Sequence, residues 1–300
     1  MRTMPLIASV VMLLTQAAPG DQWLKKPVDL PTFEGFTDFF QYDANVPFDE
    51  KVVEVTEQDG IRRERLSFQS TRGQRVTALY FRANTAGAER RPTIVYIHGG
   101  VAAGKAGFGP YGQALVRAGF NAIAFDMEHF GERKSELLTT FTEQEKHDRL
   151  YNQPATYLAW VAQNVKDAGR VIDFLVRERG ADARRIGLVG FSRGGQQAII
   201  VGAADKRFKA VVATYAGHYD RMESGHRAAA CPANYIGRIA PRPLYLLNGD
   251  FDSDYVKNVS VEPLHRLAKN PKKIVWVQTG HQAPSPEAFA DITNWLRANM

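Results

Sequence analysis

The sequence predicts an α/β protein with a mostly parallel, doubly wound sheet, helices on both faces and antiparallel strands at the N-terminal edge. Beyond Ala88, short apolar runs alternate with helical stretches, which is typical of βαβ units. Before Ala88, three strand-like runs are separated by turn residues, which favours antiparallel pairing. The chain has 300 residues and is 44% hydrophobic, enough to bury the core of one large domain.

The first residues differ in composition from the rest of the chain. Arg2 gives a short positive start, residues 5–14 are almost wholly apolar, and small residues precede a possible cleavage point after Ala17. This pattern predicts a signal peptide over residues 1–17 and an exported protein, periplasmic or secreted. The apolar run is shorter than the roughly 20 residues that span a bilayer. We therefore expect no membrane span after cleavage, with an uncleaved anchor as the alternative.

Residues 18–50 are rich in aromatic side chains and show no clear periodicity. We expect an ordered arm that packs around the domain, with a binding lip over the active site as the alternative. The main domain is expected over residues 51–300. Its strands are predicted near residues 52–55, 65–69, 76–81, 93–97, 121–125, 185–189, 209–214, 243–247 and 273–278. Its helices are predicted near residues 111–117, 158–175, 196–203 and 286–299.

A polar stretch at residues 127–154 interrupts the alternation of strands and helices. Its length indicates a functional excursion over the carboxyl edge of the sheet rather than a plain connection. Phe130, Phe141 and Tyr151 are the side chains in it that we expect to shape a substrate pocket. A flap that only packs on the domain is the alternative.

Charge and cysteine content exclude several classes of function. The formal net charge is +6, but the basic residues are scattered among acidic ones, so no nucleic-acid partner is expected. Cys231 is the single cysteine, so no internal disulfide can form. Its neighbours Ala230 and Pro232 offer no base, and a partly buried structural thiol is expected.

The strongest chemical signal is Gly190-Phe191-Ser192-Arg193-Gly194, which follows an apolar strand and precedes a helix. This is the G-x-S-x-G pattern of a nucleophile on a sharp turn. The turn requires small neighbours, because a Cβ at either glycine would clash. It also directs Ser192 towards the positive end of the following helix. Ser192 is therefore the candidate nucleophile.

A serine nucleophile needs a histidine base and a carboxylate that orients it, in the chain order serine, acid, histidine. His281 follows the last strand and is the best placed histidine. For His218, His226 and His265 we expect solvated or capping roles. The acid is expected after the strand at residues 243–247.

Three aspartates compete for the role of the acid. We choose Asp252, because its spacing from Gly249 allows a tight turn that presents the carboxylate from the loop. Asp250 could instead hold the turn, and Asp254 could cap the next helix. Either could replace Asp252 as the acid.

An oxyanion hole needs two N–H donors. One is the amide of Arg193, which follows the nucleophile. The second is assigned to Gly100 in His98-Gly99-Gly100, with Val101 as the near alternative. His98 is expected to organise this loop rather than to act as a second base.

From Val52 to the C-terminus the chain resembles the dienelactone hydrolase and acetyl xylan esterase branch of the α/β-hydrolase superfamily. The motifs that carry the resemblance are His98-Gly99-Gly100, residues 126–133, Arg185-Ile186-Gly187, residues 190–195, Asp252 and His281. Dienelactone hydrolases proper have a cysteine where this chain has Ser192, so ring opening of dienelactones is not expected. The resemblance implies hydrolysis of carboxylic esters, without a metal or an organic cofactor.

The expected substrate is a small-molecule ester with a small acyl or acetyl group, free or linked to a carbohydrate. Two other functions compete. One is a serine peptidase of the prolyl-oligopeptidase type, although the chain before the catalytic region is too short for a propeller domain. The other is a hydrolase-like binding protein without activity, which would not need Ser192, Asp252 and His281 together. The oligomeric state is left open by the sequence.

Overall fold

The computed structural model describes residues 21–225 and 227–300, so the predicted signal peptide at residues 1–17 and His226 lie outside the described residues. The described residues form a nine-stranded sheet in the order β1-β2-β3-β5-β4-β6-β7-β8-β9. All nine predicted strands are present. They are β1 (Lys51–Gln58), β2 (Ile61–Gln69), β3 (Arg75–Ala83), β4 (Thr93–Ile97), β5 (Asn121–Phe125), β6 (Ile186–Phe191), β7 (Ala210–Thr214), β8 (Leu244–Gly249) and β9 (Lys272–Val277).

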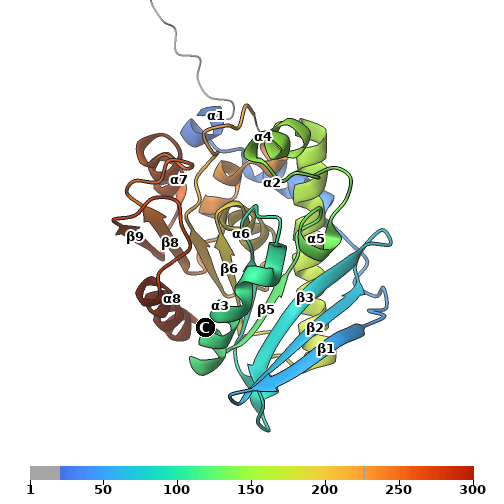
Figure 1. Ribbon diagram of the computed structural model, residues 1–300. Helices are drawn as coiled ribbons and strands as arrows, with labels where there is room; N and C mark the ends of the chain where they lie inside the picture. The colour runs from blue at the N-terminus through green and yellow to red at the C-terminus, as the bar shows by residue number, and fades with distance from the viewer. Residues whose placement is uncertain (1–20, 226) are drawn as a thin grey trace, which may run out of the picture.

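The sheet has an antiparallel and a parallel part. Strands β1, β2 and β3 pair antiparallel with one another, and β3 pairs antiparallel with β5. The six strands β5, β4, β6, β7, β8 and β9 are parallel. Every residue of β4, β5 and β7 is buried, as expected for parallel strands covered on both faces. Figure 1 shows β1 to β3 extending from one side of the molecule, away from α7, β9 and α8.

Helices cover both faces of the sheet, which confirms the predicted fold class. Helices α3 (Gly109–Arg117) and α8 (Pro286–Asn299) bury Leu115 and Phe289 in one apolar core. On the opposite face, α5 (Pro154–Arg179), α6 (Arg193–Ala204) and α7 (Glu262–Leu267) bury side chains such as Val161 and Ile199 in a second, larger core. Within the described part of the chain, no helix is long and apolar enough to cross a membrane.

The strand order reverses at β4, which lies between β5 and β6 although β5 follows it in the chain. Ligands of open α/β sheets bind outside the carboxyl ends of the strands at such a switch point. The loop after β4 and the turn after β6 meet there. The topology thus places the two predicted oxyanion donors and Ser192 at one edge of the sheet.

The described part of the N-terminal arm begins with short helices and ends in a loop over residues 41–50. It contains α1 (Asp21–Lys25), α2 (Leu30–Thr37) and η1 (Asp38–Phe40). Phe33 and Phe40 are buried against the ring of Tyr235, with centroid distances of 5.4 and 6.2 Å. The buried guanidinium of Arg170 on α5 also donates to the carbonyls of Ala44 and Val46. These contacts pack the arm onto the domain, and none of residues 21–50 lines the cleft around Ser192.

The predicted excursion contains no strand, as expected, but it has helical turns of its own. They are η4 (Gly131–Arg133), α4 (Glu143–Lys146) and the π-helical turn η5 (His147–Tyr151). The Glu145 carboxylate accepts the amides of Thr139, Thr140 and Phe141. Burial alone would raise the pKa of Glu145, but the donors of Thr139 and Thr140 outweigh it and lower the pKa to about 2. The anchored carboxylate fixes the entry to α4.

Three further expectations concern single residues. Cys231 is fully buried, more deeply than expected, and its Sγ lies 3.6 Å from Nδ1 of His218. The expectation of solvated or capping roles for His218 and His265 is wrong, because these rings are only 0% and 3% exposed. A polar loop beside His218 and a probable helix around His265 indicated surface positions, but both residues pack into the domain.

The remaining short turns are η2 (Ala88–Arg90), η3 (Gly104–Phe108), η6 (Ala228–Ala230), η7 (Pro232–Asn234), η8 (Ile236–Arg238) and η9 (Lys257–Val261).

Candidate active site

Ser192 stands alone between β6 and α6, on the sharp turn that the sequence predicts. Its backbone has φ 55° and ψ −122°, a strained conformation for a residue with a side chain. The two glycines are required by close backbone contacts. A Cβ on Gly190 would lie 2.1 Å from the Gly194 carbonyl oxygen, and a Cβ on Gly194 would lie 2.2 Å from that of Ile97. The turn therefore holds the Ser192 side chain out of the sheet.

Ser192, His281 and Asp252 come together in one hydrogen-bonded line. The Oγ atom of Ser192 lies 2.9 Å from Nε2 of His281. On the other side of the ring, Nδ1 lies 2.9 Å from Oδ2 of Asp252. Since a carboxylate only accepts hydrogen bonds, Nδ1 carries the proton and Nε2 is free to accept one from Ser192. This is the arrangement of a nucleophile, its base and an orienting acid.

The three competing aspartates have different partners. The Asp252 side chain is fully buried. Its Oδ1 accepts the amides of Asp254 and Tyr255, at 2.9 Å each. The Asp250 carboxylate accepts hydrogen bonds from the Lys257 ammonium and from the side-chain amide of Gln278, so it holds the loop after β8 in place. Asp254 is partly exposed and lies 3.9 Å from Nε2 of His281, beyond hydrogen-bond distance, and it caps no helix. Only Asp252 bonds to the imidazole.

The loop after β4 distinguishes between the two candidate oxyanion donors. The Val101 amide already donates to the Gly99 carbonyl at 2.8 Å, which closes a γ-turn around Gly100. In contrast, the amides of Gly100 and Arg193 meet no acceptor among the described residues. Two unpaired N–H groups beside Ser192 are what an oxyanion requires. The geometry therefore favours Gly100 over Val101.

His98 organises the loop of residues 98–101 after β4, which we call the oxyanion loop because it carries the expected donor Gly100. Its Nε2 accepts the Met127 amide at 3.0 Å, so the ring proton sits on Nδ1 and is donated to the Gly99 carbonyl at 2.6 Å. Burial is the main cause that lowers the pKa of His98, which keeps the ring neutral. Both ring nitrogens are engaged, and His98 does not line the cleft around Ser192.

The side chain of Arg193 has a role that the sequence did not predict. It is 3% exposed, and it donates to Asp220, to Glu223 at 2.5 Å and to Gln196 at 2.7 Å. Burial alone would lower the pKa of Arg193, but the charges around it, Glu223 first and Asp220 among them, together outweigh burial and raise the pKa. The guanidinium also stacks on the Tyr151 ring, 3.8 Å from its centroid. These contacts fix the residue whose amide is the first of the two expected oxyanion donors.

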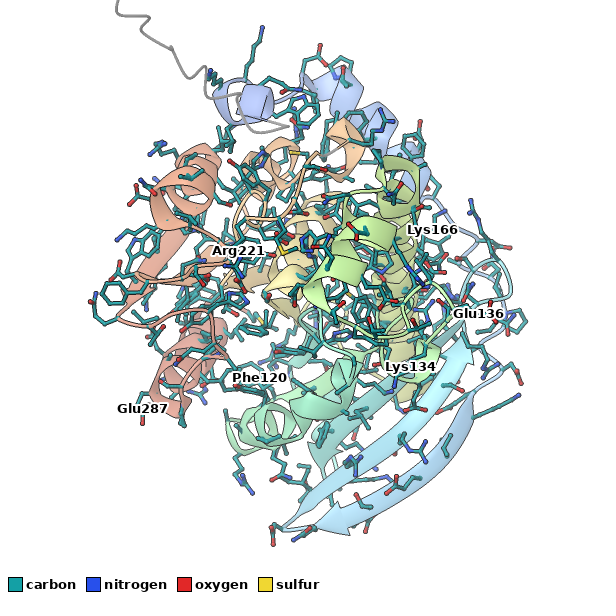
Figure 2. The ribbon with its side chains drawn as sticks, turned by 45° about the horizontal axis from the view of Figure 1, so that its top comes forward. Phe120, Lys134, Glu136, Lys166, Arg221 and Glu287 are labelled. Atoms are coloured by element: carbon teal, nitrogen blue, oxygen red, sulfur yellow. The ribbon has the colours of Figure 1, made fainter. Side chains whose placement is uncertain are left out.

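A cleft of about 280 Å³ opens around Ser192. Figure 2 shows Arg221, one of its lining residues, near the middle of the view, whereas Lys134 and Glu136 of the excursion lie to one side. Tyr151 lines the cleft, as expected. Phe130 and Phe141 do not, because they pack against each other, and Phe130 is fully buried in the core. The acidic, basic and histidine residues that line the cleft are Glu143, Lys146, His147, Arg193, Asp220, Arg221, Asp254 and His281.

The parallel sheet, the Ser192 turn after β6, and the acid and histidine after β8 and β9 define a protein of the α/β-hydrolase class. The chain belongs to the acetyl xylan esterase family, since residues 33–228 match the family model described as Acetyl xylan esterase (AXE1). It is therefore a carboxylic ester hydrolase. The matched region includes Ser192 and ends before Asp252 and His281.

Solved structures of esterases share the fold. Acetyl xylan esterase 1 from a Thermoanaerobacterium species superposes with a TM-score of 0.69 at 18% identity, over 95% of this chain and 100% of that one. An acetyl xylan esterase from a Paenibacillus species gives 0.67 at 16% identity, over 94% and 100% of the two chains. A glucuronoyl esterase from Solibacter usitatus gives 0.59 at 16% identity, over 94% of each chain. No curated protein matches the chain significantly in sequence.

Proposed function

We propose that this esterase uses Ser192 as its nucleophile, His281 as general base and Asp252 as the group that orients His281. The observation that carries the proposal is the continuous line from Ser192 Oγ through the imidazole to the Asp252 carboxylate, with 2.9 Å at each step. The backbone amides of Arg193 and Gly100 are the proposed oxyanion hole. Their lack of any acceptor within the described ranges supports this role.

The reaction follows from these roles. His281 takes the proton of Ser192 as Oγ attacks the acyl carbon, and the two amides hold the oxyanion that forms. The imidazolium then protonates the leaving alcohol, which leaves an acyl-enzyme. A water molecule, deprotonated by His281, attacks the acyl carbon, and the carboxylic acid departs as Ser192 regains its proton.

For the substrate, we propose small acyl esters, acetyl esters above all, on a carbohydrate. The family description supports acetyl groups on xylan. The cleft, at about 280 Å³, is at the small end of ligand sites and suits a short acyl chain. Its many polar lining residues suit the hydroxyl groups of a sugar. The composition of residues 1–17 supports export, so we propose that the enzyme acts in the periplasm or outside the cell.

The decisive variant is Ser192→Ala, assayed with 4-nitrophenyl acetate and acetylated xylose. We expect a loss of at least about 10⁴-fold in kcat. Ser135→Ala is the matched control, because Ser135 also bonds to a histidine, at 2.8 Å from His129 Nδ1, but on an exposed loop without oxyanion donors. The control should keep full activity. Unchanged hydrolysis by Ser192→Ala would refute the proposal that Ser192 is the nucleophile.

A second assay separates ester from peptide chemistry. We expect 4-nitrophenyl acetate to be turned over faster than the octanoate ester, because the cleft is small. Dipeptide amides should be poor substrates. Faster turnover of the amides would refute the proposed ester preference and favour the peptidase of the prolyl-oligopeptidase type.

A further inference from the structure

Lys146, the last residue of α4, is a buried cation that contacts the oxyanion loop. Its side chain lines the cleft and is 4% exposed overall. The ammonium donates to the carbonyl oxygen of Gly100 at 2.7 Å and to the Glu143 carboxylate at 2.6 Å. The Glu143 side chain is 63% exposed, so this ion pair alone gives little reason to bury the lysine. The bond to Gly100 is therefore the informative contact.

The Gly100 carbonyl is one end of a relay through two peptide groups. It shares its peptide group with the Val101 amide, and that amide donates to the Gly99 carbonyl at 2.8 Å. The Gly99 carbonyl in turn shares its peptide group with the Gly100 amide, the proposed oxyanion donor. Hydrogen bonds in such a chain polarise one another, so a cation at one end makes the N–H at the other end a stronger donor.

His98 strengthens the same relay from the side. Its Nδ1–H donates to the Gly99 carbonyl at 2.6 Å, so this oxygen accepts two hydrogen bonds. Both bonds fix the orientation of the peptide group that carries the Gly100 amide. A carbonyl that already accepts two donors also leaves its N–H more positive. The turn is therefore held at the Gly99 oxygen by His98 and at the Gly100 oxygen by Lys146.

We propose that Lys146 is a positioning residue of the oxyanion hole, whose ammonium orients and polarises the turn so that the Gly100 amide faces the reacting carbonyl. The inference rests on the proposed function and deepens it. Because Lys146 belongs to the excursion at residues 127–154, this segment would support the oxyanion hole as well as line the cleft. Lys146 stabilises the transition state through backbone groups and does not touch the substrate.

The test compares Lys146→Met with Lys146→Gln, which keeps a neutral donor, and with Lys166→Met as the matched control. Lys166 is also buried, at 8% exposure, but it lies on α5 and does not line the cleft. Figure 2 shows it at a distance from Arg221. For each variant, kcat and KM are measured with 4-nitrophenyl acetate. The inhibition constant of a trifluoromethyl ketone is measured as well, because its adduct with serine places an oxyanion in the hole.

For Lys146→Met we expect kcat to fall about 10- to 100-fold, less than the 10²- to 10³-fold typical for loss of a whole donor. KM should stay within about threefold, because the ground-state carbonyl depends little on the hole. The inhibition constant should rise by the same factor as kcat falls. Lys146→Gln should be intermediate, and Lys166→Met unchanged.

Two results would overturn the inference. One is an unchanged kcat in Lys146→Met. The other is a lower kcat with an unchanged inhibition constant, which would place the effect outside the oxyanion hole. If both Lys146 variants fail to fold by circular dichroism, the residue is structural and the inference also falls. Failure of the proposed function is distinct, because Ser192→Ala would then stay active whatever the Lys146 variants do.

Discussion

Replacing Asp252 with asparagine tests the acid of the proposed triad. The carboxylate uses Oδ1 to accept the amides of Asp254 and Tyr255 and Oδ2 to accept from His281. An asparagine keeps its oxygen on the two amides, because an NH₂ group there would face two N–H donors. The NH₂ group then faces Nδ1 of His281. The ring must move its proton to Nε2, which can no longer accept the proton of Ser192.

The expected loss in kcat is about 10⁴-fold, the effect typical of a histidine held in the wrong tautomer. At 1.36 kcal/mol per factor of ten, this raises the activation barrier by about 5 kcal/mol. KM for 4-nitrophenyl acetate should change little, since Asp252 does not line the cleft. The fold should persist, because the hydrogen bonds from the amides of Asp254 and Tyr255 remain.

Asp250→Asn and Asp254→Asn are the matched controls, both measured with the same ester. Each should keep kcat within about fivefold, because partly exposed ion pairs contribute no more than about 1 kcal/mol. The reasoning would be refuted if Asp252→Asn kept more than a tenth of the activity. It would also be refuted if Asp254→Asn lost as much as Asp252→Asn, since the acid would then be Asp254.

Three further predictions concern stability. Gly194→Ala would place a Cβ 2.2 Å from the Ile97 oxygen and should lower the free energy of unfolding by about 1–3 kcal/mol in urea, whereas Gly107→Ala, with open space around it, should not. Lys105→Met leaves the buried Asp126 without its cation and should lower the free energy of unfolding by about 3–5 kcal/mol. Lys273→Met, at the exposed pair with Asp291, should lower it by less than about 1 kcal/mol, and equal losses would contradict the prediction. Burial and then the charge of Lys272 lower the pKa of His265 from 6.5 to about 3. As the pH falls below 6.5, the unfolded chain binds a proton at His265 and the folded chain does not, so the free energy of unfolding should be about 2 kcal/mol lower at pH 5 than at pH 7. His265→Phe should remove this loss when unfolding is measured at both pH values.

The parallel part of the sheet could be predicted because its strands are continuous apolar runs. The antiparallel edge was harder, and the predicted start of β2 at residue 65 is four residues late. Residues 62–64 are all charged and show no apolar alternation, yet they belong to the strand because they have partners across it. Arg62 pairs in register with Glu57 and bonds to its carboxylate at 2.8 Å. Cross-strand charge pairs of this kind become visible only when the register is known.

Some residues of the candidate site could be predicted from the sequence, and others could not. Ser192 and its glycines could be predicted because the whole turn is one continuous piece of sequence. The choice among three aspartates depends on the backbone of one loop, which the residue types alone do not determine. Lys146 lies 46 residues from Gly100, and Asp220 lies 27 residues from Arg193, so their contacts exist only in the folded chain. Burial of His218 and His265 likewise depends on packing and not on their neighbours in sequence.

The contact of Gly194 with the carbonyls of Ile97 and His98 has a consequence for how the enzyme handles different esters. The turn that carries Ser192 and the strand that leads to Gly100 touch through backbone atoms, without a side chain between them. We expect neither to shift without the other, so the spacing between the proposed nucleophile and the proposed oxyanion donor should be the same for different substrates. We therefore expect discrimination among acyl groups and alcohols to arise in the other segments that line the cleft, at residues 143–151, 220–222 and 254–255.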